Sequence, residues 1–269
     1  GVSYSPIGYR NDLIVRGGGP SENAFYIDGI EIPNINHFAT QGASGGPVSI
    51  LDSDLIREIN FYTGSFPANR GGALSSVMDI TLKDGIPDKH SFKATVGASE
   101  VGVNARGHIG DKTTYVASVR QSYLQLLFKL LGLPLLPNYI DALAKFKVKP
   151  DRQNEFSVVA LAGFDNMKLS DSPDDPGDEY LLSYLPKLKQ ETFTIGTSYR
   201  HFGDGHVQTY VLSYNYLNNR SMKYMNNDDS DPGALKLRSS SLEGKAQFRF
   251  ENRSYYGSWT VREGGIADR

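Results

Sequence analysis

The sequence predicts a mainly β protein in two parts, a small mixed-β domain over residues 1–85 and a series of long antiparallel strands over residues 86–269. Two observations lead to this fold class. The chain holds 28 Gly, 16 Tyr and 13 Phe but one Trp, and glycine-rich, Tyr-rich composition favours strands and turns. The second part also alternates apolar and polar residues in runs of about 10, the period of a strand with two unlike faces.

The first part contains short apolar runs between turns. Each run is bounded by Gly or Asp and is long enough for a strand; they are 13–15, 24–27, 59–62 and 77–82. The dipeptide Asp28-Gly29 predicts a hairpin turn. We expect one short helix over 51–58, with Asp52 or Ser53 as its N-cap, and a turn-rich linker over 83–88.

The second part is expected to form eight strands. Their approximate ranges are 91–98, 101–109, 113–122, 139–149, 153–164, 188–202, 206–220 and 236–251. From the third strand onwards, short turns alternate with long loops, and the long loops are 123–138, 165–187 and 221–235. One face of each strand is apolar, and the other carries charges of both signs.

Two architectures satisfy this alternation. A soluble β-sandwich turns the apolar face inward, whereas an outer-membrane barrel turns it to lipid around a polar lumen. The strand length, the short and long connections and an aromatic girdle favour the membrane. The girdle residues are Tyr115, Tyr123, Tyr139, Tyr199, Tyr216, Phe248 and Phe250. The alternative is a soluble β-rich carbohydrate- or ligand-binding module.

Four motifs in the first part resemble a known family. They are LIVRGGG at 13–19, AFYIDGIEIP at 24–33, DLIREINFY at 54–62 and FPANRGGALSSVMDI at 66–80. In this order and spacing the motifs resemble the plug domain of TonB-dependent outer-membrane transporters, with a spelling most like the Bacteroidetes type. At 63–67 the sequence TGSFP departs from the Arg-Gly-Pro that the family commonly has there.

The resemblance implies the roles of both parts. Residues 1–85 would be the C-terminal part of a plug, and residues 86–269 the first strands of an incomplete transmembrane β-barrel. The whole protein would be an outer-membrane transporter for a siderophore, vitamin, oligosaccharide or peptide, and not an enzyme. Its partners would be the inner-membrane TonB complex, outer-membrane lipid, the small extracellular ligand and a surface lipoprotein.

The size of a plugged barrel adds an expectation about length. A lumen that holds a plug belongs to barrels of about 22 strands, which need on the order of 450 residues. We therefore expect this chain to be a piece of a longer protein. It opens at Gly1 without a signal peptide.

Six residues are candidates for the functional site. Arg16 is expected to contact carboxylates of the barrel wall, because the guanidinium fork suits a buried bidentate contact; an exposed position is the alternative. The resemblance implies a second plug arginine that contacts the wall, and Arg70 is the candidate for it. The loop that holds Asn34, Asn36, His37 and Phe38 mixes amide, imidazole and aromatic groups, which suit a polar ligand. Packing of this loop on the barrel wall is the alternative.

Other chemistry finds little support in the sequence. A net charge of −2 and a pI of about 6.2 argue against a nucleic-acid partner. The chain has no Cys, and its five His lack metal-ligand spacing, so no cofactor or metal is expected. Calcium at the acidic loops 171–179 and 226–231 is the exception that remains open. A third hypothesis, a hydrolase using Ser44, rests on a Gly-x-Ser-x-Gly match at 42–46 that follows no apolar strand.

Overall fold

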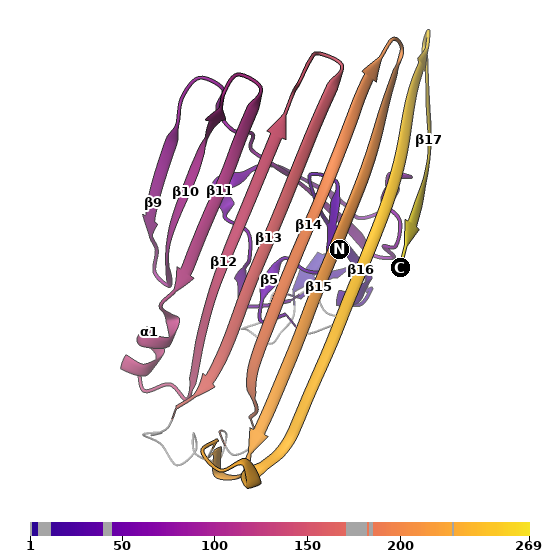
Figure 1. Cartoon of the computed structure of the whole chain (residues 1–269). Coiled ribbons are helices and arrows are strands. Elements are labelled where there is room, and N and C mark those ends of the chain that lie inside the picture. The colour runs from indigo at the N-terminus through magenta and orange to yellow at the C-terminus, as the bar shows by residue number, and fades with distance from the viewer. Residues whose placement is uncertain (1, 5–11, 40–44, 171–181, 183–184, 228) are drawn as a thin grey trace.

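The protein is described by a computed structural model, which covers residues 2–4, 12–39, 45–170, 182, 185–227 and 229–269. A large sheet of nine strands forms one layer, and the N-terminal domain lies against one face of it (Figure 1). The fold is therefore mainly β, with one large antiparallel sheet, as the sequence predicts.

The large sheet is a meander in which each strand pairs with its neighbours along the chain. Its strands are β9 (Ser91–Val96), β10 (Glu100–Ile109), β11 (Thr113–Ser122), β12 (Leu135–Val148), β13 (Asn154–Leu169), β14 (Lys187–Gly203), β15 (His206–Tyr224), β16 (Leu235–Tyr256) and β17 (Trp259–Asp268). All eight predicted strands are present. From β10 onwards, the short turns lie at one end of the sheet and the long loops at the other, and the short β9–β10 turn lies at the end of the long loops (Figure 1).

Three features of this sheet differ from the prediction. Several strands are longer than expected, up to the 22 residues of β16, because pairing continues into polar segments that carry no apolar alternation. The loop predicted over 123–138 contains helix α1 (Leu124–Leu130) and the start of β12. Strand β17 was not expected, since Gly264 and Gly265 interrupt its pattern, yet it pairs with β16 along its whole length.

The N-terminal domain is built on a four-stranded mixed sheet in the order β4-β3-β8-β7. Its strands are β3 (Asn23–Ile27), β4 (Ile30–Ile32), β7 (Ile56–Tyr62) and β8 (Ser76–Leu82), and only β3 and β8 run parallel. Two small strand pairs join β1 (Val2–Tyr4) to β2 (Leu13–Val15) and β5 (Asn36–His37) to β6 (Val48–Ser49). Single 3-10 turns occur at Pro20–Glu22, Ser53–Leu55, Met225–Asn227 and Pro232–Ala234.

The predicted hairpin is confirmed and the predicted helix is wrong. Asp28 and Gly29 both have positive φ, at 49° and 81°, and they connect the paired residues Ile27 and Ile30. Of the helix expected over 51–58, only the 3-10 turn Ser53–Leu55 forms, with the Asp52 side chain accepting from the Asp54 amide at 2.9 Å. The remainder belongs to β7, because pairing with β8 overrides the local helical signal.

The two faces of the large sheet differ in polarity and in exposure. The face against the N-terminal domain buries mainly polar side chains, among them Ser118, Arg120, Asp141, Lys145, Thr192, Thr194, Ser213, Asn215, Gln247 and Arg249. The opposite face exposes large apolar ones, among them Ile140, Phe146, Phe156, Phe164, Phe193, Ile195, Leu212, Tyr214 and Phe248. Tyr139, expected among the exposed aromatics, is instead buried on the polar face. The sheet is therefore apolar on its outside.

The hydrophobic core lies between the two parts. Apolar side chains of the N-terminal domain, such as Ile30, Ile50 and Leu82, pack against Val116 and Leu161 of the large sheet. The domain is thus attached to the inner face of the sheet by apolar packing as well as by polar contacts. None of the described helices has the length and the apolar character that a membrane span requires.

Candidate functional site

The tip of the β3–β4 hairpin meets the inner face of the large sheet through charge pairs. The Lys145 ammonium lies 2.8 Å from a carboxylate oxygen of Asp28 and 2.8 Å from one of Asp84, and Lys147 lies 2.7 Å from Asp84. Burial alone would raise the pKa of Asp84. Its hydrogen bonds and attraction to the two lysines outweigh burial and lower that pKa to about 2. The hairpin and the linker after β8 are therefore joined to β12 by shared charges.

The two arginines predicted to contact the barrel wall lie in different places. Arg70 donates to Asp79 of its own domain at 2.7 and 2.9 Å, and its guanidinium lies 3.8 Å from Glu251 of β16. The same guanidinium lies over the Tyr26 ring, 4.8 Å from its centre. Arg16 is exposed and lies against Gly64 of the N-terminal domain. It lines a cavity of about 390 Å³. Only Arg70 reaches the large sheet.

The predicted ligand loop lies on the sheet wall. Asn34, Asn36 and His37 are buried, and Phe38 is half-buried. His37 Nδ1 lies 2.5 Å from Asp165 of β13, and its Nε2 lies 3.0 Å from Asp141 of β12. This arrangement corresponds to the alternative in which the loop packs on the barrel wall. The ligand-binding role of the four residues stays a prediction.

Sequence analysis did not identify the partners of this loop. Arg120 donates to both oxygens of Asp141 at 3.0 and 2.9 Å, and to the backbone oxygen of Ser49 at 2.7 Å. A third contact joins Arg120 to Glu100 at 3.2 Å, and the Tyr139 hydroxyl donates to Glu100 at 2.6 Å. Arg120 and Asp141 lie on the polar face that alternation predicts, but their pairing depends on the strand register.

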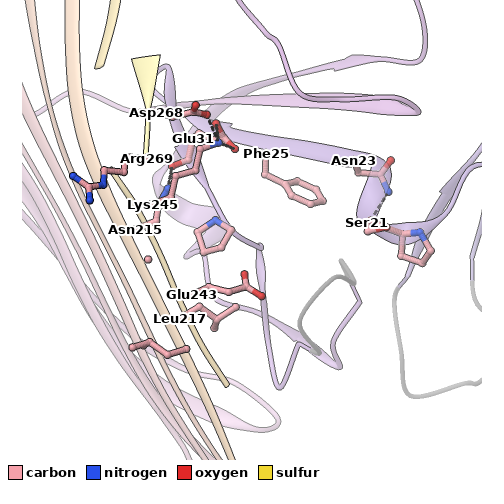
Figure 2. Close-up of a pocket in the computed structure, with 14 residues that line it drawn as sticks. Ser21, Asn23, Phe25, Glu31, Asn215, Leu217, Glu243, Lys245, Asp268 and Arg269 are labelled. Carbon is pink, nitrogen blue, oxygen red and sulfur yellow. Dashed lines mark hydrogen bonds and ion pairs between the residues drawn. The ribbon is translucent and has the colours of Figure 1, made fainter. Parts of the chain in front are cut away.

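A cleft opens between the N-terminal domain and strands β15 to β17 (Figure 2). Its volume is about 630 Å³, within the range of small-molecule sites. Lys245 lines it and lies 2.9 Å from Glu31 and 3.4 Å from Asp268. Phe25 and Leu217 supply apolar surface to the lining. This mixture of carboxylates, a cation and apolar surface suits a small polar ligand, and no sequence motif had indicated it.

Two sequence hypotheses fall largely outside the described residues. Ser44 and the acidic loop 171–179 lie there entirely. In the other acidic loop, Asp229 pairs with Lys187, and Asp231 accepts from the Gly233 amide at 2.8 Å. Within the part of the chain that the structure describes, no group of three or more His, Asp or Glu is arranged to hold a metal ion. Calcium binding stays a prediction.

A small mixed-β domain packed on the polar inner face of long antiparallel strands is the fold of the TonB-dependent receptors, and comparison with solved structures supports this. No protein-family model and no curated protein sequence matches the chain. A mutant of the ferric enterobactin receptor PfeA from Pseudomonas aeruginosa matches with a TM-score of 0.68 and 14% identity, over 95% of this chain and 42% of that one.

Two further structures give the same result. The siderophore receptor PirA from Acinetobacter baumannii has a TM-score of 0.66 at 13% identity, over 95% of this chain and 41% of its own. The copper transporter OprC has a TM-score of 0.66 at 11% identity, over 100% of this chain and 41% of its own. At such low identity the likeness establishes the fold. The chain spans less than half the length of these receptors.

Proposed function

We propose that this chain is part of a TonB-dependent receptor of the Bacteroidetes type, which takes up a small extracellular ligand across the outer membrane. Residues 1–85 act as the plug and residues 86–269 as strands of the barrel wall. The inner-membrane TonB complex supplies the energy, and a surface lipoprotein is a further partner. The protein moves its ligand without breaking a bond, so we propose no enzymatic activity.

The observation that carries this proposal is the reversal of the sheet's faces. A soluble sandwich would bury Phe164, Leu212 and Phe248, yet these side chains are exposed, while Asp141 and Lys145 are buried. Burying charges and exposing apolar rings is costly in water. The same arrangement is stable when lipid covers the apolar face and the plug supplies partners for the polar one.

The ligand class follows from the cleft and from the neighbouring folds. The printed names of the similar structures include receptors for ferric enterobactin and pyoverdine and a copper transporter. The cleft around Lys245 is of small-molecule size and polar. Among siderophores, vitamins, oligosaccharides and peptides, these observations favour a siderophore or another metal complex.

Spin labelling tests the membrane assignment directly. The chain has no Cys, so single cysteines at Phe164, Leu212 and Phe248 carry unique nitroxide labels, with Asp111→Cys in an exposed turn as control. In lipid vesicles we expect the three labels on the outward face to be accessible to oxygen and shielded from a water-soluble nickel chelate. The control should show the reverse.

The rival hypothesis, a soluble β-rich binding module, makes the opposite prediction. It requires a monodisperse protein without detergent, measurable by light scattering, and labels whose accessibility to oxygen and nickel does not change when vesicles are added. That combination would overturn the proposed function.

A further inference from the structure

His37 has both ring nitrogens directed at carboxylates. Nδ1 lies 2.5 Å from Asp165 Oδ1, and Nε2 lies 3.0 Å from Asp141 Oδ2. A neutral imidazole has one N–H and one lone pair, so one of these contacts would set a lone pair against a carboxylate oxygen. With both carboxylates ionised, both contacts are favourable only when both nitrogens carry a proton. The geometry therefore favours the charged imidazolium.

The surrounding charges agree with this state. The elements packed around His37 contribute Tyr139 and Asp141 from β12 and Asp165 from β13, and the Tyr139 ring stacks on the imidazole at 4.1 Å. Behind Asp141 stand Arg120 of β11 and then Glu100 of β10. Four carboxylates thus act on Arg120 and His37, namely Asp141, Asp165, Glu100 and Asp52. If His37 were neutral and Asp141 and Asp165 stayed ionised, buried negative charge would remain uncompensated, which is costly.

The same side chains bind the backbone of the plug loop at two points. The Phe38 amide donates to Asp165 Oδ2 at 2.6 Å, and Arg120 donates to the Ser49 carbonyl at 2.7 Å. Next to these points, β5 and β6 form a strand pair, in which Asn36 is opposite Ser49 and His37 is opposite Val48. The loop from residue 36 to 49 is therefore attached to the wall at both of its ends.

We propose that His37 is a positioning residue, a buried imidazolium that holds the plug loop on the inner face of β12 and β13 and does not itself contact the transported ligand. The plug identity of this loop rests on the proposed function. The charge state of His37 and the attachment of the loop to the sheet are independent of that proposal.

The attachment of the loop through His37 is expected to weaken as the pH rises. Burial by itself lowers the pKa of His37, but the hydrogen bonds and charges of Asp141 and Asp165 outweigh it and raise the pKa. A raised pKa means that the stabilisation is complete below the ordinary histidine value of about 6.5 and is lost as the pH rises through the raised value. The loop should loosen in alkaline solution.

Nitrogen NMR of the detergent-solubilised chain measures the charge state. With ¹⁵N-labelled histidine, and with His37→Gln to assign the signal, the two ring nitrogens of His37 should keep the protonated shift to a higher pH than free histidine, whose pKa is about 6.5. A neutral-tautomer pattern for His37 at pH 6.5 would overturn the proposal.

Two carboxylate variants on the same face of β13 distinguish a specific effect of the His37 partner from a general effect of removing a negative charge. Asp165→Asn removes one partner, so His37 should lose its proton at a lower pH, and hydrogen exchange at the Phe38 amide should rise about tenfold or more. Glu155→Gln removes a buried carboxylate near the other end of the strand, where it pairs with Lys149, and should change neither readout. Equal effects of the two variants would refute the positioning role. Because no ligand or membrane partner is used, this result is independent of the transport assignment.

Discussion

Ile30 of the plug hairpin occupies the space that a side chain at Gly196 of β14 would need. A β-carbon built on Gly196 would lie 2.6 to 2.8 Å from three carbon atoms of the Ile30 side chain. Ile50 stands in the same relation to Gly163 of β13, at 2.4 Å. The wall therefore has two positions without side chains where apolar plug residues fit.

Gly196→Ala should weaken the attachment of the plug. Overpacking of a tight contact typically costs about 1–3 kcal/mol, because the neighbouring side chain or backbone must move. We expect a loss of this size in the free energy of unfolding, measured by urea denaturation in detergent. Gly265→Ala is the control, since its β-carbon meets nothing within 4 Å. Adding Ile30→Ala should recover part of the loss due to Gly196→Ala, and strict additivity of the two changes would contradict the contact.

Lys145→Met should destabilise the protein strongly. Asp28 and Asp84 both depend on this buried ammonium, and removing one partner of a buried ion pair costs about 3–5 kcal/mol. Because Lys147 still pairs with Asp84, we expect about 3 kcal/mol in urea denaturation. Lys149→Met is the control: Lys149 is itself exposed, and Glu155 keeps Arg200 as a partner, so the change should cost about 1 kcal/mol or less. Similar losses for the two variants would show that the hairpin contact contributes little.

Acid should loosen the same contact. The lowered pKa of Asp84, at about 2, means that its stabilisation is present above the unfolded-state value of about 4. It is lost as the pH falls from there towards 2. The thermal midpoint followed by circular dichroism should therefore decrease over this range, and Asp84→Asn should decrease less steeply. If the thermal midpoints of the unchanged protein and of Asp84→Asn fall in parallel with pH, the lysines do not lower the pKa of Asp84.

A charge on the outward face should impair membrane insertion according to its depth. Leu212 and Gln208 lie on the same face of β15, but Gln208 lies near the short turn and Leu212 farther along the strand. Leu212→Arg should cost about 2–4 kcal/mol of folding in vesicles, and Gln208→Arg about 1 kcal/mol or less. Folding yield measured by heat-modifiable gel mobility gives the comparison. Equal yields would mean that this face does not meet the lipid interior.

Much of the fold could be predicted because its signals are local. Period-two alternation located eight strands, and Asp28-Gly29 located the hairpin. The helix expected over 51–58 failed because strand pairing with β8 is a distant interaction that outweighs a short local signal. A contact of Arg70 with a wall carboxylate was expected, but its partner Glu251 and the pair of His37 with Asp165 could not be predicted. The members of both pairs are far apart in sequence and meet only through strand register.

The sequence alone determined that each strand has one apolar and one polar face, since side chains alternate with a fixed period of two. It did not determine which face is inside, because alternation reads the same for a sandwich and for a lipid-facing barrel. Tertiary structure decided this. The N-terminal domain supplies Asp28, the Gly29 carbonyl and His37 as partners for Lys145, Arg249 and Asp165. Buried polar groups are stable only with such partners, so the polar face is covered and the apolar face is exposed.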